Sequence, residues 1–439
     1  MSEQKIGYKS IFKKKEYMKL ILASVVNRFG DSIDAIALTW LVYELSGSAA
    51  WSALIFGVNK IPTILIMPFA GAYVEGRRKK RIMIVTDVVR AVLVAALALF
   101  YMQQILTPEI MLIITFLIST AEAFRIPAST ALTTKLLELK YMEYGMSLSG
   151  TISEAVELVG TLSAAGIIAF LGIPGAIMID MVTFFLSAFI IAFIHIKENI
   201  EKIDTSEVKG YWNTLKDGFV YTRKNKVMQL FLVIAIYLNA ILVPINCLQA
   251  PMFSEILRGG SEMLSLFGVT VTLGMLLGTL TFPKLYGKFS ARVQFFTCGA
   301  IIGIFYIAMI LMEPLFENKI VAYGYVAVGG TILSYMAAFL SSYLSVEFVK
   351  KIDGEYLART SALMNALGDA ATPVVSWIIS AVVVYMNCSN VFLFIGILDI
   401  VVCILITKNR IFSSVKEEKL EDIVQKEKTG QNEVFSSPC

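Results

Sequence analysis

Long apolar stretches recur along the whole chain, and short polar segments separate them. Twelve of these stretches can be placed as helices, at residues 17–45, 51–75, 82–103, 109–132, 145–170, 174–196, 228–250, 263–283, 293–312, 320–346, 359–385 and 391–408. Most of them reach the ~20 residues that an α-helix needs to cross a bilayer. In hydrocarbon a helix satisfies its own backbone hydrogen-bonding groups. The pattern therefore predicts an all-α membrane protein with twelve transmembrane helices.

The polar segments divide the twelve spans into two sets of six. The longest internal polar segment follows the sixth span. We therefore expect a tail at 1–16, a six-helix bundle at 17–196, a linker at 197–227, a second six-helix bundle at 228–408 and a tail at 409–439. A faint repeat supports the division, because Phe56 and Phe267 are each followed twenty residues later by a glycine. Two pseudo-symmetric bundles are thus expected.

Cations gather on one side of the predicted membrane. When the spans are laid out, 32 of the 38 Lys and Arg residues fall on one side, and only Arg258 and Lys319 fall on the other. Because short loops rich in Lys and Arg stay in the cytoplasm, both termini are expected to be cytoplasmic. The composition, 57% hydrophobic and 16% charged, is typical of a multi-pass protein, here expected in a bacterial cell (inner) membrane.

The sequence lacks the residues that are characteristic of nucleic-acid-binding proteins, metalloproteins and enzymes. The net charge of +4 comes from short loops between apolar spans, so we expect no nucleic-acid partner. The single histidine, His195, leaves no cluster of metal ligands and no nucleophile–histidine pair, and the sequence has no phosphate-binding loop. We therefore expect no metal, no cofactor and no enzyme activity.

Five consecutive cations lie between the second and third spans. Each would cost about 2.5 to 3.5 kcal/mol at the bilayer centre, so the run is expected to form a tight cytoplasmic loop. This loop is either a plain positive anchor or part of a gate. Polar residues at helical spacing around it favour the gate. The full gating set is Gly71, Glu75, Arg77, Arg78, Lys79, Lys80, Arg81, Asp87, Arg90, Glu122 and Arg125.

The same loop carries a resemblance to a known family. The run Gly71-x-x-x-Glu75-Gly76-x-x-Lys79-Lys80-Arg81 resembles the loop 2–3 signature of the major facilitator superfamily, usually Gly-x-x-x-Asp-Arg-x-Gly-Arg-Arg/Lys. Glu75 stands in place of Asp, and Gly76 stands in place of Arg. Residues 30–48, Phe124-x-x-Pro127-Ala128 and residues 179–188 are similar to the macrolide-efflux and enterobactin-exporter branch. The resemblance implies the major facilitator fold and alternating access around a midplane site.

Several contacts of the gate can be expected from the order of the residues. Glu122 is expected to pair with Arg125 or with the cationic loop. Asp87 and Arg90 are expected to pair with each other or to hold that loop. Glu75 is expected to meet the positive N-terminal end of the eleventh span, across the gap between the bundles.

Two carboxylates lie one turn apart in the first span. Asp31 and Asp34 share a helical face with Asn27. Two nearby carboxylates disfavour double ionisation, so either aspartate is a candidate to carry a proton in a proton-coupled exporter. The alternative for Asp31 is a structural ion pair with Arg28 or Lys60.

The fifth span carries Glu154 and Glu157, again one turn apart. Both are candidates for proton coupling, and a polar contact between helices is the alternative. The antiporter branch of the superfamily usually has Gly-Pro-x-x-Gly-Gly here, whereas residues 160–165 read Gly-Thr-Leu-Ser-Ala-Ala, which still permits close helix packing. Asp180 and Asp399, in the sixth and twelfth spans, are expected to make structural hydrogen bonds.

In this superfamily, spans 1, 4, 7 and 10 line the central cavity, so their polar residues are substrate candidates. Pro244 is expected to kink the seventh span. The candidates are Asn27, Asp31, Thr115, Ser119, Asn239, Asn246, Gln249, Tyr335, Ser342 and Tyr343. Ordinary helix packing is the alternative for the tyrosines.

These features predict a secondary active transporter that exports a hydrophobic or cationic small molecule, drug-like or macrolide-like, by proton-coupled antiport. The expected partners are that substrate, protons and the lipid bilayer, and a monomer is expected. The first alternative is an exporter of a specific metabolite such as a siderophore, and an anionic cargo would need cavity cations such as Lys60. The second alternative is a non-transporting scaffold or lipid-handling protein on the same fold.

Overall fold

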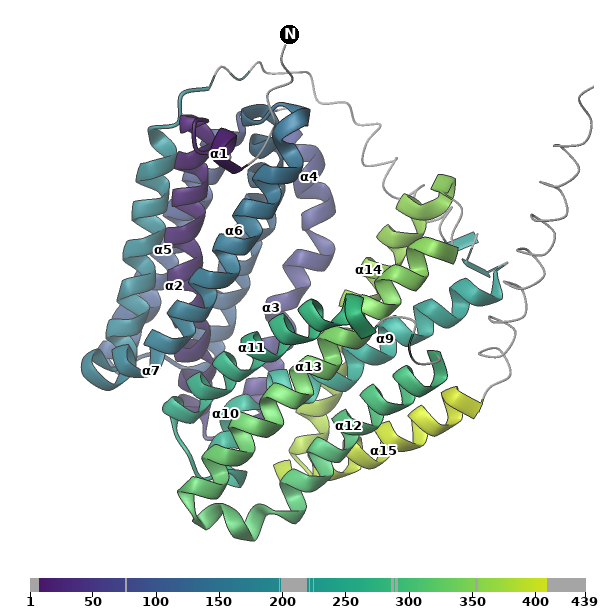
Figure 1. The fold of residues 1–439 in the computed structure, drawn as a ribbon. Coiled ribbons are helices and arrows are strands. Elements are labelled where there is room, and N and C mark those ends of the chain that lie inside the picture. Colours follow the sequence, from purple (N-terminus) through teal and green to yellow (C-terminus); the bar gives the residue numbers. More distant parts are fainter. Residues whose placement is uncertain are drawn as a thin grey trace, which may run out of the picture.

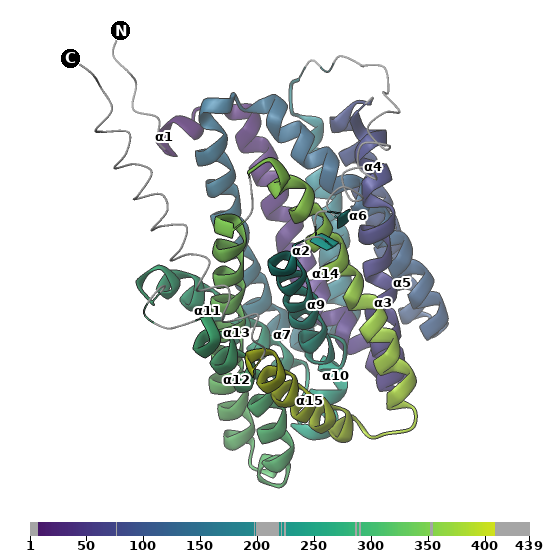
Figure 2. The same ribbon diagram turned by 90° about the vertical axis from the view of Figure 1, so that its right-hand side faces the viewer.

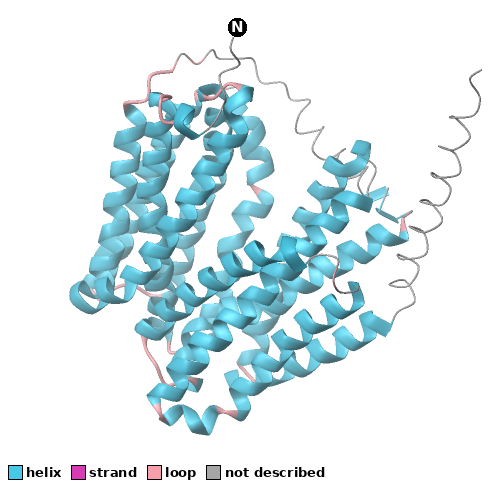
Figure 3. Ribbon diagram, viewed as in Figure 1, coloured by secondary structure: helices cyan, strands magenta, loops and turns pink. Residues whose placement is uncertain are grey.

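The computed structural model describes residues 8–75, 77–196, 198, 219–220, 222–223, 225–285, 288, 291–351 and 354–408. Within these residues the chain is helical with short connections and has no strand, which confirms the all-α prediction (Figure 3). Nine of the described helices are long and apolar enough to cross a membrane. One of the nine covers two of the predicted spans. The count of twelve stays a prediction.

The first six predicted spans form one group of helices. They correspond to α2 (Lys15–Ser46), α3 (Ala49–Leu65) with α4 (Met67–Glu75), α5 (Lys79–Met102), α6 (Pro108–Leu136) and α7 (Leu139–Ala192), preceded by the short α1 (Tyr8–Ile11). Along its length α2 packs against α7, and α5 packs against α6 and α7. This group lies on the left in Figure 1.

The remaining spans form a second group, on the right in Figure 1. It contains α9 (Lys226–Cys247), α10 (Gln249–Pro251), the π-helix η1 (Met252–Ile256), α11 (Ser261–Leu285), α12 (Ala291–Leu311), the 3₁₀-helix η2 (Glu313–Glu317), α13 (Lys319–Lys351), α14 (Gly354–Val383) and α15 (Cys388–Lys408). Within the group, α11 packs on α13, α12 packs on α15, and α14 packs on α9.

Glycine and proline mark the breaks between and within the spans. The fifth and sixth spans meet at Gly172, whose φ of 70° is accessible to glycine without steric cost. The second span breaks at Ile66, because α3 ends at Leu65, three residues after Pro62. The seventh span ends at Leu248, and the next residues form α10 and η1. The spans predicted at 228–250 and 263–283 left residues 251–262 as a connection, whereas the structure places Pro251 in α10 and Met252–Ile256 in η1.

The two groups touch at one end and separate toward the other. Figure 1 shows them close together at the predicted outer end and diverging toward the predicted cytoplasmic end, where α1 and α4 lie, and Figure 2 shows the second group from its own side. The contacts between groups run mainly between α3 and α14 and between α7 and α11. Residues 1–7, 199–218 and 409–439 lie outside the described residues, so the tails and the division at the linker stay predictions.

Candidate functional site

An ion pair joins the first span to the third. Arg90 Nη2 on α5 donates a hydrogen bond to Asp31 Oδ1 on α2 at 2.8 Å. Arg90 is buried, and its guanidinium lies 4.1 Å from the ring centroid of Phe184 on α7. The alternative of a structural ion pair named the wrong partner, since Asp31 pairs with Arg90 of α5 and not with Arg28 or Lys60.

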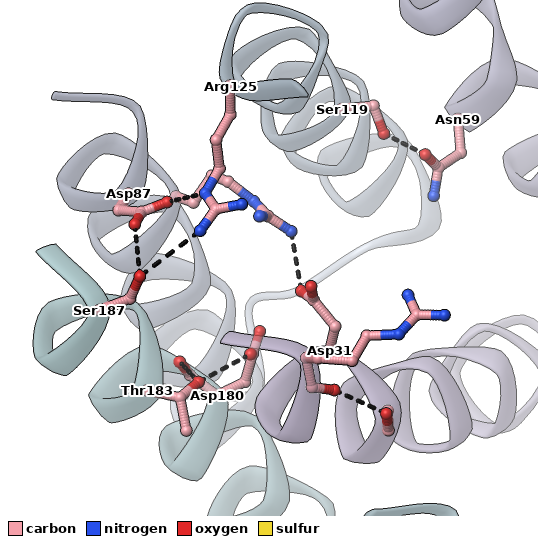
Figure 4. Close-up of polar contacts among 11 residues, drawn as sticks. Asp31, Asn59, Asp87, Ser119, Arg125, Asp180, Thr183 and Ser187 are labelled. Carbon is pink, nitrogen blue, oxygen red and sulfur yellow. Dashed lines mark hydrogen bonds and ion pairs between the residues drawn. The ribbon is translucent and has the colours of Figure 1, made fainter. Parts of the chain in front are cut away.

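A second buried network joins α5, α6 and α7 (Figure 4). Arg125 forms an ion pair with Asp87, and Ser187 Oγ donates to Asp87 Oδ2 at 2.7 Å. Arg125 Nη2 also reaches Ser187 Oγ at 3.5 Å. Asp87 and Ser187 are fully buried. This network corrects two expected contacts: Asp87 does not pair with Arg90, and Arg125 takes Asp87 rather than Glu122 as its partner.

The two glutamates of the fifth span lie in different surroundings. Glu157 forms an ion pair with Arg28 of α2, so it links the first and fifth spans. Glu154 is exposed. On α2, the Oδ1 atom of Asp34 is buried and has no hydrogen-bond partner. The Nδ2 atom of Asn27 is also buried and has no hydrogen-bond partner.

The cationic loop contacts the end of α7. The backbone N–H groups of Lys79 and Lys80 donate to the Glu198 carboxylate at 2.9 Å and 3.3 Å, where a negative charge suits the N-terminus of α5. Lys80 Nζ donates to the carbonyl oxygens of Ala192 and Ile194. These contacts lie within the first group of helices. The side chain of Glu75 lies outside the described part, so its expected contact with the eleventh span stays a prediction.

Hydrogen bonds around Glu16 connect the start of α2 to the segment that follows α7. Glu16 accepts hydrogen bonds from Lys19 Nζ at 2.8 Å and from the backbone N–H of His195 at 2.6 Å. These two donors lower the pKa of the Glu16 carboxyl below its ordinary value. Lys19 Nζ also donates to the carbonyl oxygen of Phe193.

A cavity of about 460 Å³ lies mainly against the second group of helices. Its walls come from α9, α10, α11 and α13, with Ile36 of α2 on the facing side. The polar part of the lining consists of amides and hydroxyls: Asn246, Gln249, Thr279, Ser334, Ser341 and Ser342. The described lining holds no charged side chain. Three substrate candidates, Asn246, Gln249 and Ser342, therefore share one cavity.

The cavity lies where the seventh span breaks. Asn246 is in the last turn of α9, and Gln249 begins α10 after the non-helical Leu248. Irregular backbone at membrane depth is tolerated where it lines a cavity. A second cavity, of about 440 Å³, adjoins the first through Leu242, Ala337 and Ser341, and it contains the candidate Asn239. The two cavities follow the groove between α9 and α13.

The substrate candidates on α6 and the two tyrosines on α13 make contacts within their own helix or with neighbouring helices. Thr115 Oγ1 donates to the carbonyl oxygen of Met111 in its own helix, and Ser119 hydrogen-bonds to Asn59 of α3 (Figure 4). Tyr335 hydrogen-bonds to Thr281 between α13 and α11. Tyr343 packs beside a buried aromatic cluster around Phe339. These contacts connect the side chains to their own helix or to the adjacent one, so they are structural contacts.

A set of hydrogen bonds between the two groups was not anticipated from the sequence. Ser376 Oγ and Ser380 Oγ of α14 donate to the carbonyl oxygens of Ala53 and Ala50 of α3, at 2.5 Å and 2.8 Å. Tyr43 Oη of α2 donates to the Glu255 carboxylate of η1 at 2.6 Å. We call these three bonds the outer clasp. The sequence offered no signal for it, since serine–carbonyl bonds have no motif.

Comparisons with known proteins agree on one family. The family model described as the Major Facilitator Superfamily matches residues 20–375. The chain is 23% identical over 363 residues to macrolide efflux protein A of Streptococcus pyogenes, which covers 82% of this chain and 87% of that protein. It is 22% identical over 307 residues to the multidrug efflux pump Tap of Mycobacterium bovis, covering 67% and 72% of the two chains.

Solved structures show the same fold. A bacterial homologue of the iron transporter ferroportin, in an inward-facing state, has a TM-score of 0.68 at 17% identity and covers 90% of this chain and 99% of that chain. The nucleoside transporter NupG has a TM-score of 0.63 at 16% identity and covers 91% and 98%.

Proposed function

The chain belongs to the Major Facilitator Superfamily, and on that premise we propose that it exports a hydrophobic, cationic small molecule across a bacterial cell membrane in exchange for protons. Members of this superfamily are multi-pass membrane transporters and not enzymes. The proposed mechanism is alternating access by two six-helix halves.

The cavity between α9 and α13 carries the proposal for the substrate. Its lining is apolar with scattered amides and hydroxyls, which suits a large neutral body such as a macrolide ring. Carboxylates lie on the first group of helices, where Glu154 is exposed. A cationic group on the substrate would be attracted to that side. Relatives named as macrolide and multidrug efflux proteins agree with such a cargo.

The cations within the spans argue against an anionic cargo such as a siderophore. Arg28 is paired with Glu157, and Arg90 is paired with Asp31. Lys60 of α3 is exposed, and its charge acts on Asp369 of α14. Each of these cations thus lies near a carboxylate, which leaves little net positive charge for an anion.

The gate at the predicted cytoplasmic end is part of the same proposal. In the described conformation the cationic loop is held by the end of α7, while the two groups of helices diverge there. We infer that the loop exchanges these contacts for contacts with the second group when that end closes. A Glu75→Gln variant is then expected to transport more slowly than the wild type at equal surface expression. An unchanged rate would favour a plain anchor.

The function is tested by flux into inside-out proteoliposomes with and without an imposed pH gradient. The probes are a macrolide (erythromycin), a cationic dye (ethidium) and a catecholate siderophore. Uptake of erythromycin or ethidium that depends on the gradient supports the proposal. Uptake of the siderophore alone would identify a metabolite exporter. If no probe moves although the protein is folded, the scaffold alternative gains support.

A further inference from the structure

Two arginines and four aspartates lie near one another in the first group of helices, so the carboxyl groups there outnumber the arginines. Arg125 is paired with Asp87, and Arg90 is paired with Asp31. Two further aspartates lie in the same region, Asp34 on α2 and Asp180 on α7, and neither forms an ion pair among the described residues. The sequence suggested only structural hydrogen bonds for Asp180.

Asp180 and Asp34 both have an unsatisfied buried oxygen. Asp180 is 1% exposed; its Oδ1 lies 3.2 Å from Thr183 Oγ1, whereas its Oδ2 has no hydrogen-bond partner. Oδ1 of Asp34 is likewise buried without a partner. A buried carboxylate that lacks both a cation and its hydrogen-bond donors is strongly disfavoured, and a bound proton removes its charge.

The two aspartates lie where α2 and α7 approach closely. A Cβ atom at Gly30 of α2 would overlap Thr183 and Asp180, so only glycine fits at this crossing. Asp34 follows Gly30 by one helical turn. Asp34 and Asp180 interact electrostatically with each other. Both carboxyl groups also interact electrostatically with Asp31 and Arg90.

Two more charged groups complete the surroundings. Glu122 of α6 and Asp87 of α5 both act electrostatically on Arg90. Asp87 is already neutralised by Arg125. Arg90 therefore remains the cation that faces the carboxyl groups of Asp31, Asp34 and Asp180. Figure 4 shows Asp31 and Asp180 on neighbouring helices, with the Asp87–Arg125 network beside them.

We propose that Asp34 and Asp180 hold one proton between α2 and α7, and that this proton is the one released during transport. The proposal rests on the proton antiport proposed above. When the proton is released to water, one carboxyl group becomes an anion and needs a hydrogen-bond donor. The buried Nε–H of Arg90 has no partner in the described conformation and can supply one. Release of the proton thus draws Arg90 from Asp31 toward Asp180 and changes how α2, α5 and α7 pack.

This assignment separates the proton site from the other carboxylates of the first group. Asp31 already has Arg90 as its partner, and Glu157 has Arg28. Glu154 is exposed and can remain ionised in contact with water or substrate. Asp34 and Asp180 are left as the two carboxyl groups of the first group that have a buried oxygen without a hydrogen-bond partner and form no ion pair among the described residues.

Infrared spectroscopy of the purified protein tests the proton directly. The measurements are made in an Asp399→Asn background, because Asp399 of the second group is also buried with an oxygen that has no hydrogen-bond partner and forms no ion pair among the described residues. This background is expected to show a C=O band of a protonated carboxyl group that shifts in D₂O and disappears as the pH rises. Asp34→Asn and Asp180→Asn are each expected to lose this band, because the remaining carboxylate then pairs with Arg90. Asp180→Glu keeps it, and Glu154→Gln is the control that leaves it unchanged. A band that survives both Asn variants, or that sodium ions displace at constant pH, overturns the proposal.

Transport measurements separate this proposal from the proposed function. In proteoliposomes, Asp180→Asn is expected to lose uptake driven by a pH gradient but to keep substrate exchange across the membrane without a gradient. If the wild type responds to the pH gradient and Asp180→Asn responds equally, the proton site is wrong and antiport stands. If the wild type ignores the gradient although the infrared band is present, antiport is wrong; the protonated pair then stands, but its release in transport is overturned.

Discussion

Arg90 of α5 and Asp31 of α2, 59 residues apart in the chain, form a partly buried ion pair at 2.8 Å that joins the two helices. The side chain of Arg90 is 5% exposed and that of Asp31 is 24% exposed. Because Arg90 also faces Asp34 and Asp180, the pair connects the first span to the carboxyl groups that surround it.

Removing one member of this pair is expected to destabilise the protein. Asp31→Asn leaves Arg90 buried without a full counter-charge. Breaking a fully buried pair costs about 3 to 5 kcal/mol, which is the upper bound for this partly buried pair. The double variant Asp31→Asn/Arg90→Gln removes both charges and is expected to recover part of the loss. Thermal unfolding in detergent measures the difference. A double variant less stable than either single variant would contradict the pairing.

The outer clasp is expected to stabilise the conformation closed at the outer end relative to the conformation open at that end. Ser376→Ala/Ser380→Ala removes two hydrogen bonds between α14 and α3, each contributing about 0.5 to 1.5 kcal/mol. The population open at the outer end should rise by a factor of about 5 to 150. Distances between spin labels on the outer ends of the two groups report this population.

The matched control for the clasp is Ser163→Ala. Ser163 Oγ bonds only to the carbonyl oxygen of Val159 in its own helix, so its loss should not shift the population. Equal label distances in the clasp variant and the control would show that the clasp does not hold the outer end closed.

Gly30 is expected to tolerate no larger residue. In Gly30→Ala the new methyl group meets Thr183 and Asp180, and overpacking of this kind costs about 1 to 3 kcal/mol. Gly166→Ala on α7 is the control, since a Cβ there meets nothing within 4 Å. A melting temperature that falls only in Gly30→Ala supports the close crossing of α2 and α7; equal effects would argue against it.

The cluster around Glu16 gives a prediction about pH. Its donors lower the pKa of the Glu16 carboxyl from 4.5, so its stabilising effect is present above about pH 4.5 and is lost as the pH falls through the lowered value. Glu16→Gln should therefore reduce the free energy of unfolding at neutral pH by less than about 1 kcal/mol, because the ion pair is partly exposed. The melting temperature should fall slightly as a result. The difference from wild type should vanish in acid. A difference that grows in acid would contradict the prediction.

The sequence predicted the helices well because the signals for them are local. An apolar run of sufficient length and the surrounding cations define a span without any knowledge of its neighbours. Gly172 likewise marks a break that the structure contains. Pro244 lies inside α9, which continues to Cys247, so the expected kink there stays a prediction. The π-helix Met252–Ile256 was missed because it follows Pro251 and precedes Gly259 and Gly260, so the segment reads as a connection between two spans.

The partners of the charged residues were harder to predict, for a physical reason. Asp87 and Arg90 are one turn apart, which suggested a mutual pair, yet each faces a different neighbouring helix. The choice depends on how each helix is rotated in the bundle, and spacing along one helix does not contain that information. The same holds for Arg28, whose partner Glu157 lies 129 residues away.

The candidate cavity was predicted in part. Asn239, Asn246, Gln249 and Ser342 were selected from the spans that line the centre of the superfamily fold, and they do line the two adjoining cavities. Tyr335 was selected by the same reasoning but hydrogen-bonds to Thr281 in the neighbouring helix. A stripe of polar residues marks a face of a helix, and only packing decides whether that face meets a cavity or another helix.

The central claim, exchange of substrate for protons, is tested most directly by recording pH inside proteoliposomes that start without any gradient. Addition of erythromycin or ethidium to inside-out vesicles should drive protons out of the lumen as substrate enters, so that the lumen becomes alkaline. Protein-free liposomes and the Asp180→Asn variant should show no such change. Substrate uptake by the wild type with no movement of protons would contradict the account.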